Sequence, residues 1–211
     1  MMPGRTWPWL LVAALFLQSG IAASAAPETF EAGRDYQRLP GQAQTLADDK
    51  IEVVEFFMFS CEHCLIFEPI LQAWEQRLPK DVVLRRMPVA LGVIGKRYAR
   101  IFYTAQALDV GAQIQAATFD ALQRQKQVLR SDDEVRAFFV DKGIKAEAFD
   151  QAFYSPEVES QMTQGVLLAQ LYGITTVPSI GVDGRFRLSA QQSRTYQRFL
   201  RITDYLVNTS R

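Results

Sequence analysis

The sequence is poor in the residues that build metal centres and disulfide frameworks. Its 211 residues include 2 Cys and 1 His. A tetrahedral structural zinc site takes four Cys or His ligands, so three such residues argue against one. A single possible bridge also differs from the several that staple small secreted domains. We therefore expect no metal site and no bound cofactor.

The sequence also has no excess of positive or of negative charge. The 23 basic residues balance the 23 acidic residues. A neutral balance provides no electrostatic footprint for nucleic acid or for an anionic membrane surface. We expect neither as a partner.

The apolar run at the start of the chain is too short to span a bilayer. Trp7 to Leu17 is almost wholly apolar, but a spanning helix needs about 18 residues or more. Arg5 precedes the run, and Ala23-Ser24-Ala25 supplies the small residues that signal peptidases cut after. We predict a secretory signal over residues 1–25, cleaved after Ala25, with a retained membrane anchor as the alternative. Export implies an oxidising compartment, in which disulfides persist.

Both cysteines and the one histidine fall within six positions, Ser60 to Leu65. A bridge between Cys61 and Cys64 closes a ring of only four residues, so it constrains the unfolded chain little and tends to store strain. Strained, accessible disulfides are the labile and catalytic ones. The spacing therefore favours a redox pair. A structural staple, two idle cysteines and half of a metal site are the alternatives.

The chain on either side predicts a strand that ends at the cysteines and a helix that begins there. Ile51 to Phe59 is apolar except for Glu52 and Glu55, as in a strand buried on both faces. Apolar residues then recur at three- and four-residue steps, which predicts a helix from Glu62 to about Arg77. Cys61 would lie at the N-terminus of this helix, where free N–H groups and the helix dipole favour an anion.

The rest of the chain predicts a long helical stretch between two groups of strands. Further strands are expected at Asp35 to Leu39, Val82 to Val89, Ser179 to Val182 and Arg185 to Leu188. Helices are expected at Gly95 to Leu108, Ala112 to Leu129, Asp132 to Asp141, Ala146 to Phe153, Pro156 to Tyr172 and Gln191 to Val207. Ser131 and Ser155 are the predicted N-caps of two of these helices, and Asp183-Gly184 predicts a hairpin between the last two strands. The mature chain thus divides into 26–91, a helical subdomain over 92–172, and 173–211.

Several motifs in this order resemble the thioredoxin fold. They are Glu55-Phe56-Phe57, Cys61 to Cys64, Phe67-Glu68, Pro69 eight residues after the first cysteine, Val177-Pro178 and Val182-Asp183-Gly184. The helical insertion, the signal peptide and a His before the second cysteine narrow this to a resemblance to the DsbA family of periplasmic disulfide oxidoreductases. The resemblance implies an α/β thioredoxin fold with a helical subdomain inserted between its βαβ and ββα halves.

The family resemblance also implies a chemistry for the cysteine pair. Cys61 would be the attacked and leaving sulfur, Cys64 the resolving one, and His63 would help to hold Cys61 as a thiolate. Pro178 would be cis, so that the backbone of Val177 faces the cysteines and pairs with an extended substrate.

The implied protein is a disulfide donor in the periplasm, working as a monomer. Its substrates would be unfolded or partly folded exported polypeptides with cysteines, and a membrane oxidant of the DsbB type would reoxidise it. Glu55 would be a buried acid that exchanges protons with Cys64.

The sequence departs from the family pattern at two positions. The common dipeptide between the cysteines is Pro-His, and here it is Glu62-His63. A carboxylate beside the thiolate should raise the pKa of Cys61 and weaken the protein as an oxidant. Ser60 stands where the family often has an aromatic residue, which affects substrate contacts.

Two other functions remain open at this point. The same fold serves reductases and isomerases, in which the cysteine pair is kept mainly reduced. A binding or chaperone module that merely retains its cysteines would keep its function in a Cys61→Ala variant.

Overall fold

The computed structural model describes Met1, residues 28–43, residue 45 and residues 49–211. The predicted signal peptide and its cleavage site after Ala25 lie outside the described residues. Within the described part of the chain, no helix is both long and apolar enough to cross a membrane.

Five strands form one mixed sheet. They are β1 (Gln37–Arg38), β2 (Ile51–Phe57), β3 (Val82–Pro88), β4 (Ser179–Val182) and β5 (Phe186–Ser189), in the order β1-β5-β4-β2-β3. β2 runs parallel to β3 and antiparallel to β4, and the remaining pairs are antiparallel. Two parallel strands need a long crossover connection. The helix that the sequence predicts after Cys61 forms this connection between β2 and β3.

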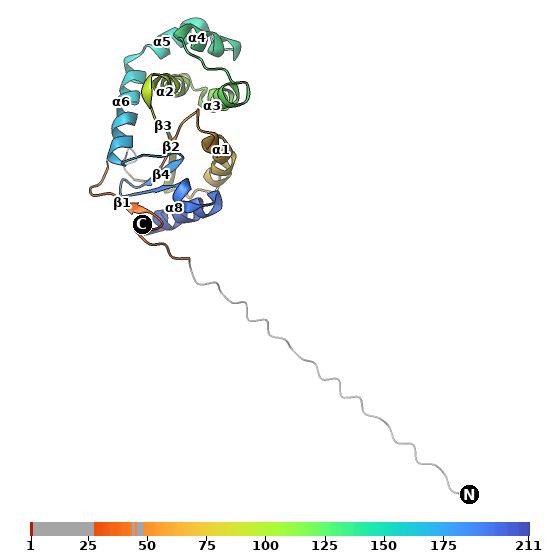
Figure 1. The fold of residues 1–211 in the computed structure, drawn as a ribbon, viewed down its shortest axis with the longest axis vertical. Helices are drawn as coiled ribbons and strands as arrows, with labels where there is room; N and C mark the ends of the chain where they lie inside the picture. Colours follow the sequence, from red (N-terminus) through yellow and green to blue (C-terminus); the bar gives the residue numbers. More distant parts are fainter. Residues whose placement is uncertain (2–27, 44, 46–48) are drawn as a thin grey trace.

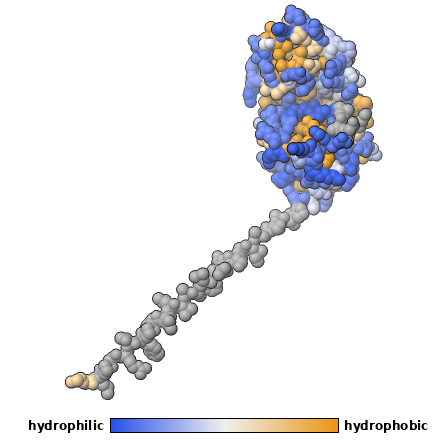
Figure 2. Space-filling view, turned by 180° about the vertical axis from the view of Figure 1, so that it is seen from behind, coloured by the Kyte–Doolittle hydropathy of each residue, from blue (hydrophilic) through white to orange (hydrophobic). Residues whose placement is uncertain are grey.

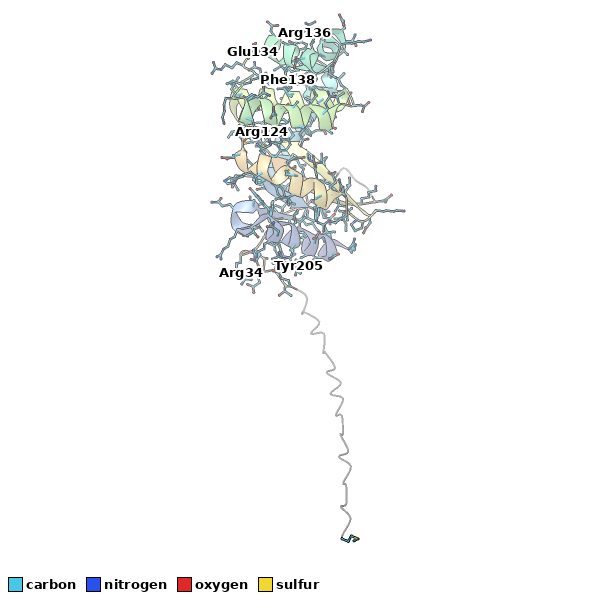
Figure 3. The ribbon with its side chains drawn as sticks, turned by 90° about the vertical axis from the view of Figure 1, so that its right-hand side faces the viewer. Arg34, Arg124, Glu134, Arg136, Phe138 and Tyr205 are labelled. Carbon is cyan, nitrogen blue, oxygen red and sulfur yellow. The ribbon has the colours of Figure 1, made fainter. Side chains whose placement is uncertain are left out.

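The helices fall into a group beyond the sheet and a group beside it. They are α1 (Glu62–Glu75), α2 (Gly92–Ala107), α3 (Gly111–Phe119), the π-helix η1 (Asp120–Arg124), α4 (Asp132–Asp141), α5 (Ala146–Phe153), α6 (Pro156–Leu171), α7 (Ala190–Ser193) and α8 (Tyr196–Ser210). In Figure 1, α2 to α5 gather at one end of the molecule and α8 lies at the other, with α1 and the sheet between them. Figure 3 shows α1 as the layer between the helical group and α8.

β2 is buried along its whole length, as its composition predicts. Its two carboxylates are matched by arginines on the neighbouring strand: Glu52 pairs with Arg85 at 3.0 Å, and Glu55 lies 3.7 Å from Arg86. An isolated buried charge is very costly, so the close Arg85 contact is what makes the Glu52 carboxylate tolerable in a central strand.

The apolar core of the described residues has three clusters. One, which includes Phe57, Phe119 and Cys64, joins the end of β2 to the helical group. The second, which includes Phe67 and Phe199, joins α1 to α8. The third joins β2 to the end of α6 through Phe56 and Leu168. The face in Figure 2 is mostly hydrophilic, and its hydrophobic residues gather mainly at the end formed by the helical group.

Two predicted helices differ from the structure. The helix expected over Ala112 to Leu129 becomes α3 and the π-helix η1, and it ends at Arg124 because Lys126 and Leu129 adopt positive φ. The helix expected over Gln191 to Val207 is broken into α7 and α8, because Arg194 also has positive φ (67°). L-residues tolerate this conformation only singly, so it interrupts a helix.

The other differences lie at element ends. The strand expected over Asp35 to Leu39 shrinks to β1, and the one expected to reach Phe59 ends at Phe57. The predicted caps are confirmed: the hydroxyls of Ser131 and Ser155 accept N–H bonds from the first turns of α4 and α6.

The predicted hairpin between β4 and β5 is confirmed, and its glycine is sterically required. Asp183 and Gly184 both have positive φ. A Cβ at Gly184 would lie 2.1 Å from the carbonyl oxygen of Ala43, a distance that backbone atoms do not permit. The hairpin therefore fixes β4, and with it the loop that precedes β4.

Candidate active site

Cys61 is the N-cap residue of α1. Its backbone is extended (φ −90°, ψ 114°), and its sulfur accepts a hydrogen bond from the N–H of Cys64 at 3.3 Å. Side-chain oxygens of Ser, Thr, Asp or Asn usually occupy this place, because the first N–H groups of a helix have no partner within it. Here a sulfur takes the role, so the end of the helix is aimed at the Cys61 Sγ.

The two sulfurs differ in exposure and in acidity. Both are free thiols in this structure; Cys64 is fully buried and Cys61 is partly exposed. A hydrogen bond from the Cys64 thiol, assisted by the N–H groups of Cys64 and His63 and by the charge of His63, lowers the pKa of Cys61 to about 6 against the opposing effect of burial. The same hydrogen bond and burial raise the pKa of Cys64. At neutral pH the negative charge therefore rests on Cys61 and the proton on Cys64.

The loop before β4 faces the cysteine pair. The Val177–Pro178 peptide bond is cis, as the resemblance implies, and the Cys61 Sγ lies 3.7 Å from the carbonyl oxygen of Val177. His63, Val177, Pro178 and Tyr196 help to line a cavity of about 520 Å³ beside the sulfur. A backbone carbonyl and an open cavity thus lie beside the exposed thiol.

Glu55 is a fully buried carboxyl behind the cysteines. Burial, reinforced by the negative charge of Glu68, raises the pKa of Glu55 to about 8, although Arg86 opposes the shift. Arg86 sits 3.5 Å from Glu68 and 2.9 Å from Glu75, so its charge is shared among three carboxyl groups. The longest of these contacts is the one to Glu55, which accepts no hydrogen bond from any described residue. Burial therefore prevails, and Glu55 holds its proton near neutral pH.

A larger cavity lies on the carboxyl side of this cluster. Its volume is about 700 Å³, and Glu68, Glu75 and Arg86 are among its lining residues, whereas neither cysteine is. It belongs to the surroundings of the buried acid rather than to the reacting sulfurs.

Gln123 holds the backbone on one side of Cys61. Its side-chain amide in η1 donates two hydrogen bonds of 2.8 Å, to the carbonyl oxygens of Phe59 and Cys61. Arg124, the next residue, marks in Figure 3 the boundary where the helical group meets the α1 layer. The helical group is therefore attached to the backbone that flanks the reactive sulfur.

Tyr196, the first residue of α8, contacts the segment from another side. Its hydroxyl donates to the carbonyl oxygen of His63 at 3.1 Å and lies 3.4 Å from His63 Nδ1. Its ring stacks on Phe67 of α1, with centroids 5.2 Å apart.

The structure brings most of the predicted site residues together. Cys61, His63, Cys64, Val177 and Pro178 meet at one place, while Glu62 is exposed on the first turn of α1 and Glu55 lies buried in β2.

Sequence reasoning missed Gln123, Tyr196 and Arg86. The sequence does indicate a residue of the Arg86 type, because an acid within an apolar strand favours a cation on a neighbouring strand. The two others lie 62 and 133 residues from the positions they contact and have no local signature.

Comparison with known proteins decides the family. A family model described as a DSBA-like thioredoxin domain matches residues 94–201. DsbA of Azotobacter vinelandii is 34% identical over 197 residues, which cover 93% of this chain and 92% of that protein. The chain belongs to the DsbA family. It is therefore a thiol:disulfide oxidoreductase, and because this relative covers nearly all of the chain, the likeness includes the cysteine segment.

Solved DsbA structures share the fold. The crystal structure of Pseudomonas aeruginosa DsbA matches with a TM-score of 0.82 and 30% identity, over 86% of this chain and 94% of that one. Oxidoreductase DsbA from Xylella fastidiosa matches with a TM-score of 0.78 and 32% identity, over 85% and 97%. The predicted thioredoxin fold with a helical insertion is thereby confirmed for this member of the DsbA family.

Replacing Gln123 should loosen the cysteine segment of this DsbA-family protein. Gln123→Leu leaves two partly buried carbonyl groups without a donor, which should cost about 1–3 kcal/mol of unfolding free energy. Urea denaturation at pH 7 measures this. The matched control is Gln113→Leu, since Gln113 is an exposed glutamine of α3 that donates to one carbonyl, and its loss should cost less than about 0.5 kcal/mol. Equal losses in the two variants would contradict a special role for Gln123.

Glu55 should make stability depend on pH. An unfolded carboxyl releases its proton near the ordinary pKa of 4.5, whereas the buried one keeps it up to about 8. The free energy of unfolding therefore decreases as the pH rises from 4.5 to 8. Glu55→Gln should remove this penalty, with little effect on stability at pH 4.5 and a gain on the order of 4 kcal/mol at pH 8.

Thermal and urea unfolding of the oxidised protein at several pH values measures this difference without thiol titration. Glu147→Gln, at an exposed position on α5, should show no such pH dependence. A Glu55→Gln gain that is the same at pH 4.5 and pH 8 would contradict the buried neutral acid.

Proposed function

We propose that this protein donates its Cys61–Cys64 disulfide to reduced polypeptides through a mixed disulfide at Cys61. The observation that carries the proposal is the place of the Cys61 sulfur, which caps α1 and accepts the N–H of the buried Cys64. This place lowers the pKa of the Cys61 thiol to about 6, and the proton stays on Cys64. A stable Cys61 thiolate favours the reduced protein, and a protein that is stable when reduced has an oxidising disulfide. A depressed cysteine pKa and a strongly oxidising disulfide are established properties of DsbA itself, so the family and the geometry agree.

The reaction balances over two exchanges. A client thiolate attacks the Cys61 Sγ, the Cys61–Cys64 bond breaks, and Cys64 leaves with the electron pair and takes up a proton. A second client thiolate then attacks the client sulfur of the mixed disulfide, and Cys61 leaves as a thiolate. The client loses two electrons and gains a disulfide, and the protein ends with two reduced cysteines.

Glu55 is suited to supply the proton that Cys64 takes up. The carboxyl is buried and neutral near pH 7, and in its ionised form it raises the pKa of the Cys64 thiol, which puts the two groups within electrostatic reach. A proton moved from Glu55 to Cys64 avoids leaving a second thiolate in the core.

Val177 and Pro178 would hold the client. The carbonyl of Val177 lies beside Cys61, where it can accept from the N–H of an extended client strand. The adjoining cavity, lined by Ile66 and Pro178 among others, suits an apolar client side chain.

The expected setting follows from the family and the signal peptide. Clients are exported polypeptides with cysteines in the periplasm, the protein acts as a monomer without a prosthetic group, and a membrane oxidant of the DsbB type restores the disulfide. With domain limits near residues 92 and 172, every reacting residue would lie outside the inserted helices.

Oxidation of a reduced client tests the donation. The oxidised protein should form disulfides in a reduced, unfolded ribonuclease stoichiometrically within minutes, and Cys61→Ser should abolish this because the attacked sulfur is gone. Cys64→Ser, oxidised by glutathione at Cys61, should accumulate a mixed disulfide with the client. Client oxidation by Cys61→Ser at the wild-type rate would overturn the assignment of Cys61. A wild-type protein that leaves the client reduced would overturn the donation, and would favour a module that merely retains its cysteines.

Glu62 should weaken the oxidant. It is exposed on the first turn of α1, one residue from Cys61, so its negative charge opposes the thiolate. Glu62→Pro should make the glutathione equilibrium more oxidising by about three-fold, since proline also suits the first position of a helix. Glu62→Gln separates the charge from the ring and should shift the equilibrium in the same direction.

The same measurement bears on the direction of electron flow. An unchanged or less oxidising equilibrium in both Glu62 variants would contradict the proposed charge effect. A wild-type equilibrium close to that of a reducing thioredoxin would instead favour the reductase or isomerase alternative.

A further inference from the structure

His63 is the one histidine of the chain, and its ring is held from outside its own helix. Its own helix α1 supplies Cys61, Glu62 and Cys64 as charged or titratable neighbours. From the C-terminal segment come Tyr196 and Arg194, which line the same cavity as His63. Among these groups, Tyr196 is the one whose hydroxyl reaches the imidazole.

The contacts of the Tyr196 hydroxyl assign its hydrogen. The hydroxyl proton goes to the carbonyl oxygen of His63, which can only accept. The lone pairs of the same oxygen then face His63 Nδ1 at 3.4 Å, where they can accept an N–H. The arrangement therefore favours forms of the ring that carry a proton on Nδ1, and the imidazolium is one of them.

The position of the hydroxyl is set by packing. The Tyr196 ring stacks on the buried ring of Phe67, which in turn packs against Phe199 at 5.2 Å between centroids. Tyr196 is also the first residue of α8, next to the Thr195 cap that accepts from the N–H of Arg198. A capped helix and an aromatic stack thus place the oxygen beside His63.

We propose that Tyr196 is a positioning residue for the exchange reaction, which acts through the His63 ring to stabilise the Cys61 thiolate. The inference rests on the proposed function, because it names how that function's thiolate is sustained. The charge of His63 is one cause of the low pKa of Cys61, and burial together with the nearby cysteines raises the pKa of the Tyr196 phenol, which keeps its proton. The α8 end of the fold is thereby coupled to the redox centre.

Tyr196→Phe tests this with the stacking ring kept. Because His63 is the only histidine, one pair of imidazole ¹⁵N resonances reports which ring nitrogen carries the proton. In the reduced variant these resonances should shift away from the Nδ1–H form, since the acceptor for Nδ1–H is lost. The Cys61 thiol pKa should rise, and the glutathione equilibrium should become about two- to three-fold less oxidising.

Tyr205→Phe is the matched control. Tyr205 lies on the same helix and packs against Phe30 and Tyr36, away from the cysteines, and Figure 3 shows it at the end of the molecule near Arg34. This variant should leave all three readouts at wild-type values. Any loss of folding common to both variants would appear in their unfolding curves.

A second background separates an action through His63 from a structural one. In a His63→Ser protein, adding Tyr196→Phe should leave the glutathione equilibrium unchanged, because the group it acts through is gone. An equal shift in both backgrounds, or wild-type imidazole ¹⁵N resonances in Tyr196→Phe, would overturn the inference. A wild-type protein whose Cys61 has an ordinary thiol pKa would instead refute the proposed function itself, so the two failures are distinguishable.

Discussion

The structure depends on one electrostatic arrangement, the charge of the Cys61 sulfur at the start of α1. The sulfur takes the N-cap place, and the N–H groups and the Cys64 thiol donate to it. Most of the fold supports this arrangement. β2 ends just before the cysteine segment, and α1 begins there with its N-terminus at the sulfur. The loop at Pro178 places the carbonyl oxygen of Val177 3.7 Å from the Cys61 sulfur.

Two parts of the chain far from the cysteines also hold this segment. Gln123 from the inserted helices bonds the carbonyls of Phe59 and Cys61, and Tyr196 from α8 bonds that of His63. The inserted helices therefore do more than enlarge the core, because they touch the backbone of the reacting residue.

The sequence predicts local features better than distant contacts. The buried strand, the helix behind Cys61, the serine caps and the Asp183-Gly184 hairpin each depend on residues within one element, and the structure confirms them. The early end of the helix at Arg124 and the break at Arg194 coincide with positive φ at ordinary residues, which their residue types do not predict. The sequence does not indicate the roles of Gln123 and Tyr196, because each role depends on a contact between segments that are distant in the chain.

The most direct test is the titration of the reduced protein by thiolate absorbance at 240 nm. We expect one thiolate to form with a pKa near 6, absent in Cys61→Ser, and no second thiolate below about pH 9, because Cys64 is buried and shares its proton with Cys61. Two thiols titrating together at the ordinary cysteine pKa of about 8.5 would contradict the central role of the Cys61 charge.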